Sequence, residues 1–191
     1  MDSSTQLPAP SHRFQAMAEL WMLGANLLWW TPIVLFLWPV FRADPQLGAI
    51  LLLVMLACGT ITGGLPLHWL MLSQWEVLRT PYRRMGVRQF RMLVYEGALM
   101  NWLVRGSQPF SILQSRASLE KWRLNSLQNE RRHWAWLAIS LPLLIYAGIT
   151  GSYAFAVAFA LGNLPLNIYP ILLQRDSRAR LTRMISRVAA A

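Results

Sequence analysis

Hydrophobic residues dominate three long stretches of the chain that contain no charged side chain when histidine is counted as neutral. These stretches cover residues 20–41, 45–75 and 133–174. A helix needs about 20 residues to cross a hydrocarbon layer of roughly 30 Å, so the first two stretches predict one transmembrane helix each and the third is long enough for two. Small and turn-forming residues at 148–152 are where the third stretch is expected to reverse. The pattern therefore predicts an all-α integral membrane protein with about four transmembrane helices, at about 19–41, 47–72, 133–150 and 153–173.

The distribution of charge decides how the basic composition is interpreted. The 191 residues include 18 Lys and Arg against 8 Asp and Glu, a net charge of +10, which in a soluble protein would point to nucleic acid. Only 14% of the residues are charged, against about 25% in soluble domains. With four spans, the arm, the central segment and the tail all lie on the same side of the membrane. These three segments carry every basic residue except Arg42, which lies on the other side. Lys and Arg stay preferentially on the cytoplasmic side. We therefore expect a multi-pass protein of the cell (inner) membrane with both termini cytoplasmic and no nucleic-acid partner.

The segments outside the spans divide into an arm, a central segment and a tail. Residues 1–15 are expected to form a disordered N-terminal arm, and residues 16–191 a single membrane domain that ends in a basic tail at 175–191. The central segment, 76–132, is expected to lie at the cytoplasmic interface.

Within this segment, residues 77–95 and, more weakly, 112–127 place apolar side chains near one helical face and arginines on another. In the first stretch the apolar residues are Leu78, Tyr82, Met85, Phe90 and Leu93, and the basic ones are Arg84, Arg88 and Arg91. The pattern predicts amphipathic interfacial helices whose arginines face anionic lipid headgroups.

The candidate chemistry is limited by what the chain lacks. It has no G-x-S-x-G elbow, no phosphate-binding glycine loop and no histidine followed five positions later by aspartate. The single cysteine, Cys58, excludes an intramolecular disulfide and a multi-cysteine zinc site, and no metal site or cofactor is predicted. Acid and base chemistry near neutral pH would then depend on one of three histidines.

His133 has the most suggestive neighbours of the three. Glu130 precedes it by three positions, so on a helix the carboxylate can hydrogen-bond one imidazole nitrogen and leave the other free as a base. The alternative is that His133 and Trp134 anchor a span at the interface while Glu130 pairs with Arg131 or Arg132. The residues alone leave both interpretations open.

The last predicted span carries a second group of polar residues. Asn163 and Asn167 are one helical turn apart and Gln174 follows seven positions later, so the three amides can share a face. Amides in a span are costly unless they face protein or a polar cavity, so they indicate either a site or hydrogen bonds that join helices. The arginines that follow, Arg175, Arg178 and Arg180, could hold a phosphate or carboxylate, or simply mark the cytoplasmic end of the span.

At these residues the sequence resembles the glycosyl-4,4'-diaponeurosporenoate acyltransferases, small bacterial membrane proteins of the staphyloxanthin-type carotenoid pathway. The family's E-x-x-H-W pattern corresponds to Glu130, His133 and Trp134, and its N-x-x-P-I-x-x-Q-R-Y-N-R-x-R-L pattern to residues 167–181, with Asp176-Ser177 in place of Tyr-Asn. An earlier block with Glu76, Tyr82 and a G-V-R run at 86–88 is also similar.

The resemblance implies transfer of a fatty acyl group to a hydroxyl of a glycosylated carotenoid or similar glycolipid. Because these polar residues converge at the ends of the last two predicted spans, we hypothesise that His133, oriented by Glu130, deprotonates the hydroxyl, and that Asn167 or Gln174 donates to the developing oxyanion. Substrate would be bound by Arg175, Arg178, Arg180, Glu76, Tyr82 and Arg88, with an acyl-CoA-like donor as co-substrate. The alternative from another class is a non-catalytic membrane scaffold that binds anionic lipid and a partner enzyme through the same arginines.

Overall fold

The computed structural model describes residues 12–79, 81–93 and 116–190, which form helices and contain no β-strand. The all-α class is therefore confirmed over the part of the chain that is described. The α-helices are α1 (His12–Ala43), α2 (Pro45–Gly63), α3 (Gln74–Arg79), α4 (Val87–Leu93), α6 (Arg116–Ile149), α7 (Tyr153–Asn163) and α8 (Tyr169–Ala190). Three single-turn elements join them: the 3₁₀-helices η1 (Leu67–Leu70) and η2 (Pro81–Met85), and the π-helical η3 (Leu164–Ile168).

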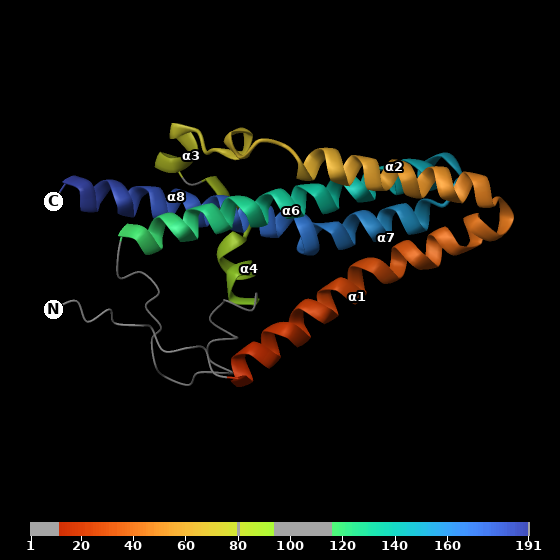
Figure 1. Ribbon diagram of the computed structural model, residues 1–191, viewed down its shortest axis with the longest axis horizontal. Coiled ribbons are helices and arrows are strands. Elements are labelled where there is room, and N and C mark those ends of the chain that lie inside the picture. Colours follow the sequence, from red (N-terminus) through yellow and green to blue (C-terminus); the bar gives the residue numbers. More distant parts are fainter. Residues whose placement is uncertain (1–11, 80, 94–115, 191) are drawn as a thin grey trace.

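Two antiparallel helical hairpins build the long bundle seen in Figure 1. One pairs α1 with α2 and the other pairs α6 with α7, and both reverse at the same end of the molecule. From α7 the chain continues through η3 into α8, which runs alongside α6 to the opposite end, where α3 and α4 pack against α8. The polar and charged side chains of the candidate site come from elements that meet at this opposite end.

The two reversals follow from local chemistry. At the first, Asp44 caps α2, because its carboxylate accepts hydrogen bonds from the backbone N–H groups of Gln46 and Leu47, each at 3.0 Å, and Pro45 fits the first helical turn. At the second, Gly151 has φ +75°, a left-handed conformation that glycine adopts without steric cost. The predicted reversal at 148–152 is thereby confirmed.

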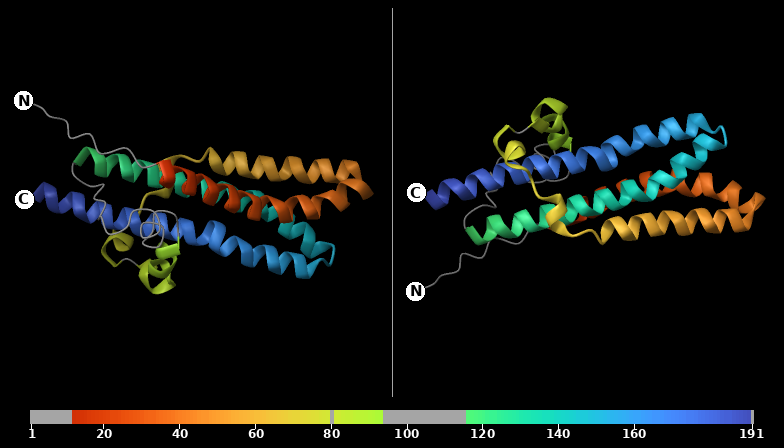
Figure 2. Two further views of the ribbon diagram at one scale, coloured as in Figure 1. Left: turned by 90° about the horizontal axis from the view of Figure 1, so that it is seen from below. Right: turned by 90° about the horizontal axis from the view of Figure 1, so that it is seen from above.

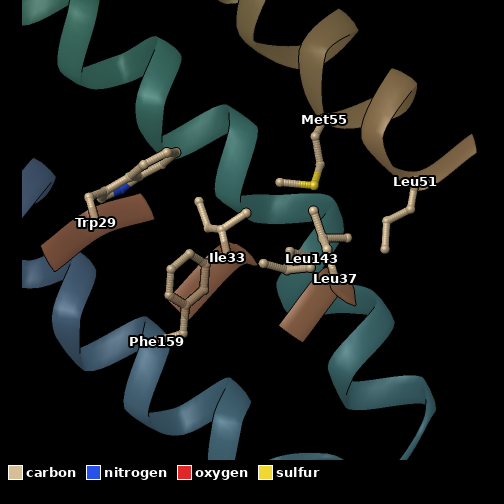
Figure 3. Close-up of a cluster of buried hydrophobic side chains, with 7 residues drawn as sticks. All are labelled: Trp29, Ile33, Leu37, Leu51, Met55, Leu143 and Phe159. Atoms are coloured by element: carbon tan, nitrogen blue, oxygen red, sulfur yellow. The ribbon is translucent and has the colours of Figure 1, made fainter. Parts of the chain in front are cut away.

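The apolar core lies in the half of the bundle nearest these reversals. Seven buried side chains from four helices meet there, as Figure 3 shows: Trp29, Ile33, Leu37, Leu51, Met55, Leu143 and Phe159. Glycine allows the closest approach, because a Cβ atom on Gly59 of α2 would lie 2.4 Å from Ile139 Cγ1 of α6. Gly59 and Gly63 form the G-x-x-x-G spacing by which membrane helices pack tightly.

Three helical segments are long and apolar enough to cross a membrane: Leu23–Ala43, Pro45–Gly63 and Tyr153–Ser186. They carry many exposed apolar side chains, such as Leu35 and Ile61, and indicate a multi-pass membrane protein. The predicted span at 133–150 is not among them, although it is helical and packs against α2. Its apolar part is short, since it follows directly on Arg131 and Arg132 and contains Ser140 and Pro142.

The predicted end of the second span at residue 72 is wrong. Helix α2 ends at Gly63, and Gly64 closes it by donating from its N–H to the Thr60 carbonyl at 2.9 Å. Two consecutive glycines weaken the helix, and Pro66 disfavours a helical conformation of the residue before it. Residues 67–70 instead form the separate turn η1.

The predicted interfacial helix at 77–95 is also wrong, because this stretch is divided into α3, η2 and α4. Pro81 has no N–H to continue a helix, and Gly86 has φ +76°. As a result its apolar residues do not share one face: Tyr82 is buried, whereas Leu78 and Met85 are exposed.

The second predicted amphipathic stretch, 112–127, is not a separate interfacial helix over the residues that are described. From Arg116 it belongs to α6, which continues without a break into the predicted third span and has 34 residues. At 1.5 Å per residue α6 is roughly 50 Å long, well beyond the thickness of a hydrocarbon core. One continuous helix therefore joins the polar stretch to the apolar stretch of the predicted third span.

Similarly, the basic tail predicted at 175–191 is helical as far as Ala190, as part of α8. Residues 12–15, assigned from sequence to the arm, belong to α1. The rest of the arm, residues 1–11, lies outside the described residues.

Candidate functional site

Glu130 lies at the centre of the polar end of the bundle. Its side chain is fully buried between α6 and α8. Its Oε1 accepts from Arg175 Nη1 at 2.9 Å and from Trp134 Nε1 at 3.2 Å, and its Oε2 forms an ion pair with Arg178 Nη2. Glu130 therefore bonds neither to His133, as one interpretation predicted, nor to Arg131 or Arg132, as the other did; its charge partners lie 45 and 48 positions later in the sequence.

Arg175 links Glu130 to the short helices on the outside of α8. Its Nη2 donates to Glu76 Oε1 at 2.8 Å, and its Nε donates to the same oxygen and to the Tyr82 hydroxyl, both at 3.0 Å. The Tyr82 hydroxyl also donates to Glu76. One guanidinium thus joins α3, η2, α6 and α8, and the predicted substrate-binding residues Glu76, Tyr82 and Arg175 are brought together in one network.

Arg178 completes this buried network on the next turn of α8. Besides Glu130, it donates to the backbone carbonyls of Leu70 at 3.1 Å and Ser126 at 3.3 Å. Its side chain is only 3% exposed. Arg175 and Arg178 are therefore paired with internal carboxylates and carbonyls, and their role in holding a substrate phosphate stays a prediction.

The network shifts the ionisation of its outer members. Partial burial by itself raises the pKa of Glu76, but hydrogen bonds from Tyr82, from the Ser73 backbone N–H at 2.8 Å and from Arg175 outweigh burial and hold the pKa at about 2, against an ordinary value of 4.5. Burial and the hydrogen bond to Glu76 raise the pKa of Tyr82 above 10. At neutral pH the pair is a carboxylate and a neutral phenol.

Asp176 and Ser177, the two departures from the family pattern, form a second link between helices. Asp176 is buried, and its Oδ2 accepts from Arg91 Nη2 of α4 at 2.9 Å and from Arg180 Nη2 at 3.0 Å. Ser177 Oγ accepts from the same Arg91 nitrogen at 3.1 Å. Arg180, predicted to bind substrate, is thus also paired within α8, whereas Arg88 is exposed on α4.

His133 lies where the polar half of α6 gives way to its apolar half, and it is partly buried against η3. Its Nδ1 is 3.4 Å from Asn167 Oδ1, and the Asn167 amide nitrogen is 2.7 Å from Asn163 Oδ1. With the Asn167 amide in the opposite orientation, its oxygen accepts from Trp29 Nε1 at 3.0 Å. Asn167 is therefore the hydrogen-bonding neighbour of His133 in place of Glu130.

A polar pocket of about 290 Å³ opens on the outer side of the α6–α8 contact. Six of its lining residues come from the polar half of α6 and the seventh is Gln174 of α8: Trp122, Asn125, Ser126, Gln128, Asn129, Arg132 and Gln174. Of the predicted site residues, the pocket therefore includes only Gln174. It begins one helical turn from His133, because Asn129 precedes the histidine by four positions.

Sequence reasoning missed the pocket residues on α6, although a signal was present. Trp122, Asn125, Asn129 and Arg132 recur at helical spacing on one face. Placing a helix boundary between the stretch at 112–127 and the span at 133–150 divided this face in two. One continuous helix from Arg116 would have made it visible.

Comparison with known proteins gives one match that covers most of this geometry. The family model of glycosyl-4,4'-diaponeurosporenoate acyltransferases matches residues 66–187, a range that includes the buried network, His133 with Asn167, and the pocket. Helices α1 and α2 both lie outside it. No curated protein and no solved structure matches the chain. Since the match extends over well more than half of the 191 residues, the chain belongs to the glycosyl-4,4'-diaponeurosporenoate acyltransferase family, acyltransferases of a carotenoid pathway.

Proposed function

We propose that the protein transfers a fatty acyl group to a hydroxyl of a glycosylated carotenoid or similar glycolipid, with His133 as the general base. The observation that carries the proposal is the position of His133. It lies at the boundary between the polar and apolar halves of α6, beside Asn167 and one turn from a polar pocket. A reaction between an apolar acyl donor and an acceptor with a sugar head needs its reacting atoms at such a boundary.

The orientation of the Asn167 amide decides which nitrogen of His133 acts. With Asn167 Oδ1 facing the ring, 3.4 Å from Nδ1, the proton lies on Nδ1, which leaves the Nε2 lone pair to accept the proton of the acceptor hydroxyl. The hydroxyl oxygen then forms a bond to the acyl carbonyl carbon of an activated ester such as acyl-CoA. When the bond from that carbon to the leaving thiolate breaks, the imidazolium returns its proton to the thiolate.

The oxyanion formed in this step needs a hydrogen-bond donor. Asn167 is less suited to the role, because its amide is engaged by Asn163 and His133. Gln174 lines the pocket and is the better candidate among the residues predicted for this role, with an effect typically of about 3 to 4 kcal/mol on the barrier.

The experiment compares His133→Ala with His68→Ala in purified protein reconstituted into lipid nanodiscs. His68 is an exposed histidine in η1 and provides the matched control. Supplied with acyl-CoA and a glycosylated carotenoid, the His133 variant should form acylated product about 10²- to 10⁴-fold more slowly, the usual contribution of a general base, while the His68 variant keeps the wild-type rate. Wild-type activity in His133→Ala would exclude the assignment.

We further propose that this reaction occurs at the cytoplasmic face. Arg42 lies at the end where the hairpins reverse, whereas the basic residues of α3, α4 and α8 lie at the other end, as Lys and Arg do on the cytoplasmic side of membrane proteins. In a Cys58→Ser background, which removes the single cysteine, Ser186→Cys should react with an impermeant maleimide only after cells are opened, and Asp44→Cys before. The reverse pattern would contradict this orientation.

A further inference from the structure

We propose that the polar pocket between α6 and α8 binds the sugar ring of the acceptor, as a site for a neutral hexose. This inference rests on the proposed function and adds to it the recognition of the acceptor's head group. Because sugar binding is measured separately from acyl transfer, the two proposals can fail independently.

The lining of the pocket has the chemistry that a hexose requires. The four amides of Asn125, Gln128, Asn129 and Gln174 each offer a carbonyl acceptor and two N–H donors. Sugar hydroxyls also donate and accept, so alternating amide groups can satisfy several of them at once. Trp122 adds an apolar indole surface of the kind that packs against the C–H face of a pyranose.

The charges around the pocket favour a neutral ligand over the phosphates of an acyl donor. Among the lining residues only Arg132 is charged, and its Nη1 donates to Asn129 Oδ1 at 3.4 Å. Binding of phosphate in proteins relies on converging cations or on backbone N–H groups at a helix N-terminus. The nearby Arg175 and Arg178 are turned into the buried network with Glu130 and do not line the pocket.

The size and position of the pocket agree with a single sugar ring. A volume of about 290 Å³ is just below the roughly 300 to 1,000 Å³ typical of ligand pockets, which suits one ring better than a nucleotide or an acyl chain. The pocket lies on the polar half of α6, and Asn129 and Arg132 at one end adjoin His133. A sugar bound here would present a hydroxyl to the imidazole while its lipid tail follows the apolar half of the bundle.

The test is saturation-transfer NMR on the full-length protein in phosphatidylcholine nanodiscs, with methyl β-D-glucopyranoside and methyl β-D-galactopyranoside as probes. We expect saturation transfer from the wild-type protein to the ring protons of at least one probe. Trp122→Ala and Asn129→Ala should each weaken binding about tenfold, as for residues central to a binding site. The matched controls are Trp75→Ala and Gln74→Ala in α3, both exposed and outside the pocket, and they should bind like the wild type.

The outcomes separate this proposal from the enzyme mechanism. If neither sugar shows saturation transfer, or if the pocket variants bind as the wild type does, the sugar site is excluded even where acyl transfer persists. If coenzyme A displaces the sugar, and if the pocket variants also lose coenzyme A binding, the pocket is the site of the acyl donor and the sugar proposal is wrong. If sugar binding depends on Trp122 while His133→Ala retains full activity, the sugar site is supported and the assignment of His133 as the base is wrong.

Discussion

Arg175 Nη1 lies 2.9 Å from Glu130 Oε1, within a network in which Arg178 takes the other carboxylate oxygen. This relationship assigns Glu130 to holding the polar end of the bundle together, because α6 and α8 contribute the two sides of the pair and Arg175 extends it to Glu76 of α3. Removing one member of such a buried group leaves an uncompensated charge in the interior, which is strongly destabilising.

Glu130→Gln should therefore destabilise the protein strongly. The variant keeps the size of the side chain but leaves Arg178 buried without a carboxylate and Arg175 with Glu76 alone, and breaking a buried pair from one side typically costs about 3 to 5 kcal/mol. Thermal unfolding in detergent, followed by intrinsic tryptophan fluorescence, measures the loss. Glu19→Gln, at an exposed position on α1, should stay within about 0.5 kcal/mol of the wild type.

A second substitution distinguishes this structural role from a catalytic one. In Glu130→Gln/Arg178→Met, the removal of one uncompensated cation should restore part of the lost stability. If instead Glu130→Gln melts like the wild type while its acyl transfer falls and the pH dependence of the rate shifts, Glu130 acts on His133 and the assignment to the network is wrong.

The contact of Arg91 with Asp176 predicts the effect of the family departure at this position. Asp176→Asn removes the charge that Arg91 and Arg180 share and should loosen the docking of α4 on α8. We expect amide hydrogen exchange in residues 87–93 to accelerate about tenfold, equivalent to about 1.4 kcal/mol of local stability. Asp44→Asn is the matched control, because asparagine caps α2 about as well as aspartate, and it should leave exchange in α4 unchanged. Unchanged exchange in α4 of Asp176→Asn would show that this pair does not hold the helix.

Hydropathy located the helices well, because apolar stretches without charge have no stable alternative to a helix in a membrane. It was less reliable at their ends. Glycine and proline at 63–66 end α2 early, and Pro81 and Gly86 divide the central segment. The prediction gave the longer apolar pattern more weight than these glycines and prolines. It therefore extended the second span to residue 72 and joined residues 77–95 into one helix.

The candidate site illustrates a different limit. The polar residues Glu130, His133 and Asn167 were identified from type and spacing alone, but their partners were assigned to neighbours in sequence. The charge partners of Glu130 are Arg175 and Arg178, 45 and 48 positions away, and a pairing between helices depends on their register and rotation. Helical spacing identifies which residues share a face and carries no information on what lies opposite.

The low pKa of Glu76 predicts a pH dependence of stability in acid. Its pKa falls from 4.5 to about 2 in the folded protein, so folding favours the carboxylate. That contribution is complete above pH 4.5 and is lost as the pH falls through about 2, below which the carboxyl is protonated in both states. Melting temperatures recorded from pH 5.5 to 2.5 should therefore decline more steeply for the wild type than for Glu76→Gln. Glu19→Gln should follow the wild type, and parallel curves for Glu76→Gln and wild type would contradict the stabilised carboxylate.

Gly59 predicts how tightly α2 must pack on α6. A methyl group at this position would lie 2.4 Å from Ile139 Cγ1, so Gly59→Ala has to displace either the side chain or the helix, which in a well-packed interior typically costs about 1 to 3 kcal/mol. Gly24→Ala is the matched control, because a methyl group there meets nothing within 4 Å and alanine favours the helix. This variant should be neutral or stabilising in the same thermal unfolding assay.

The double variant Gly59→Ala/Ile139→Ala removes the clash. Since the two residues touch, its loss of stability should be smaller than the sum of the two single losses. Additive losses would mean that the approach of α2 to α6 is not set by this contact.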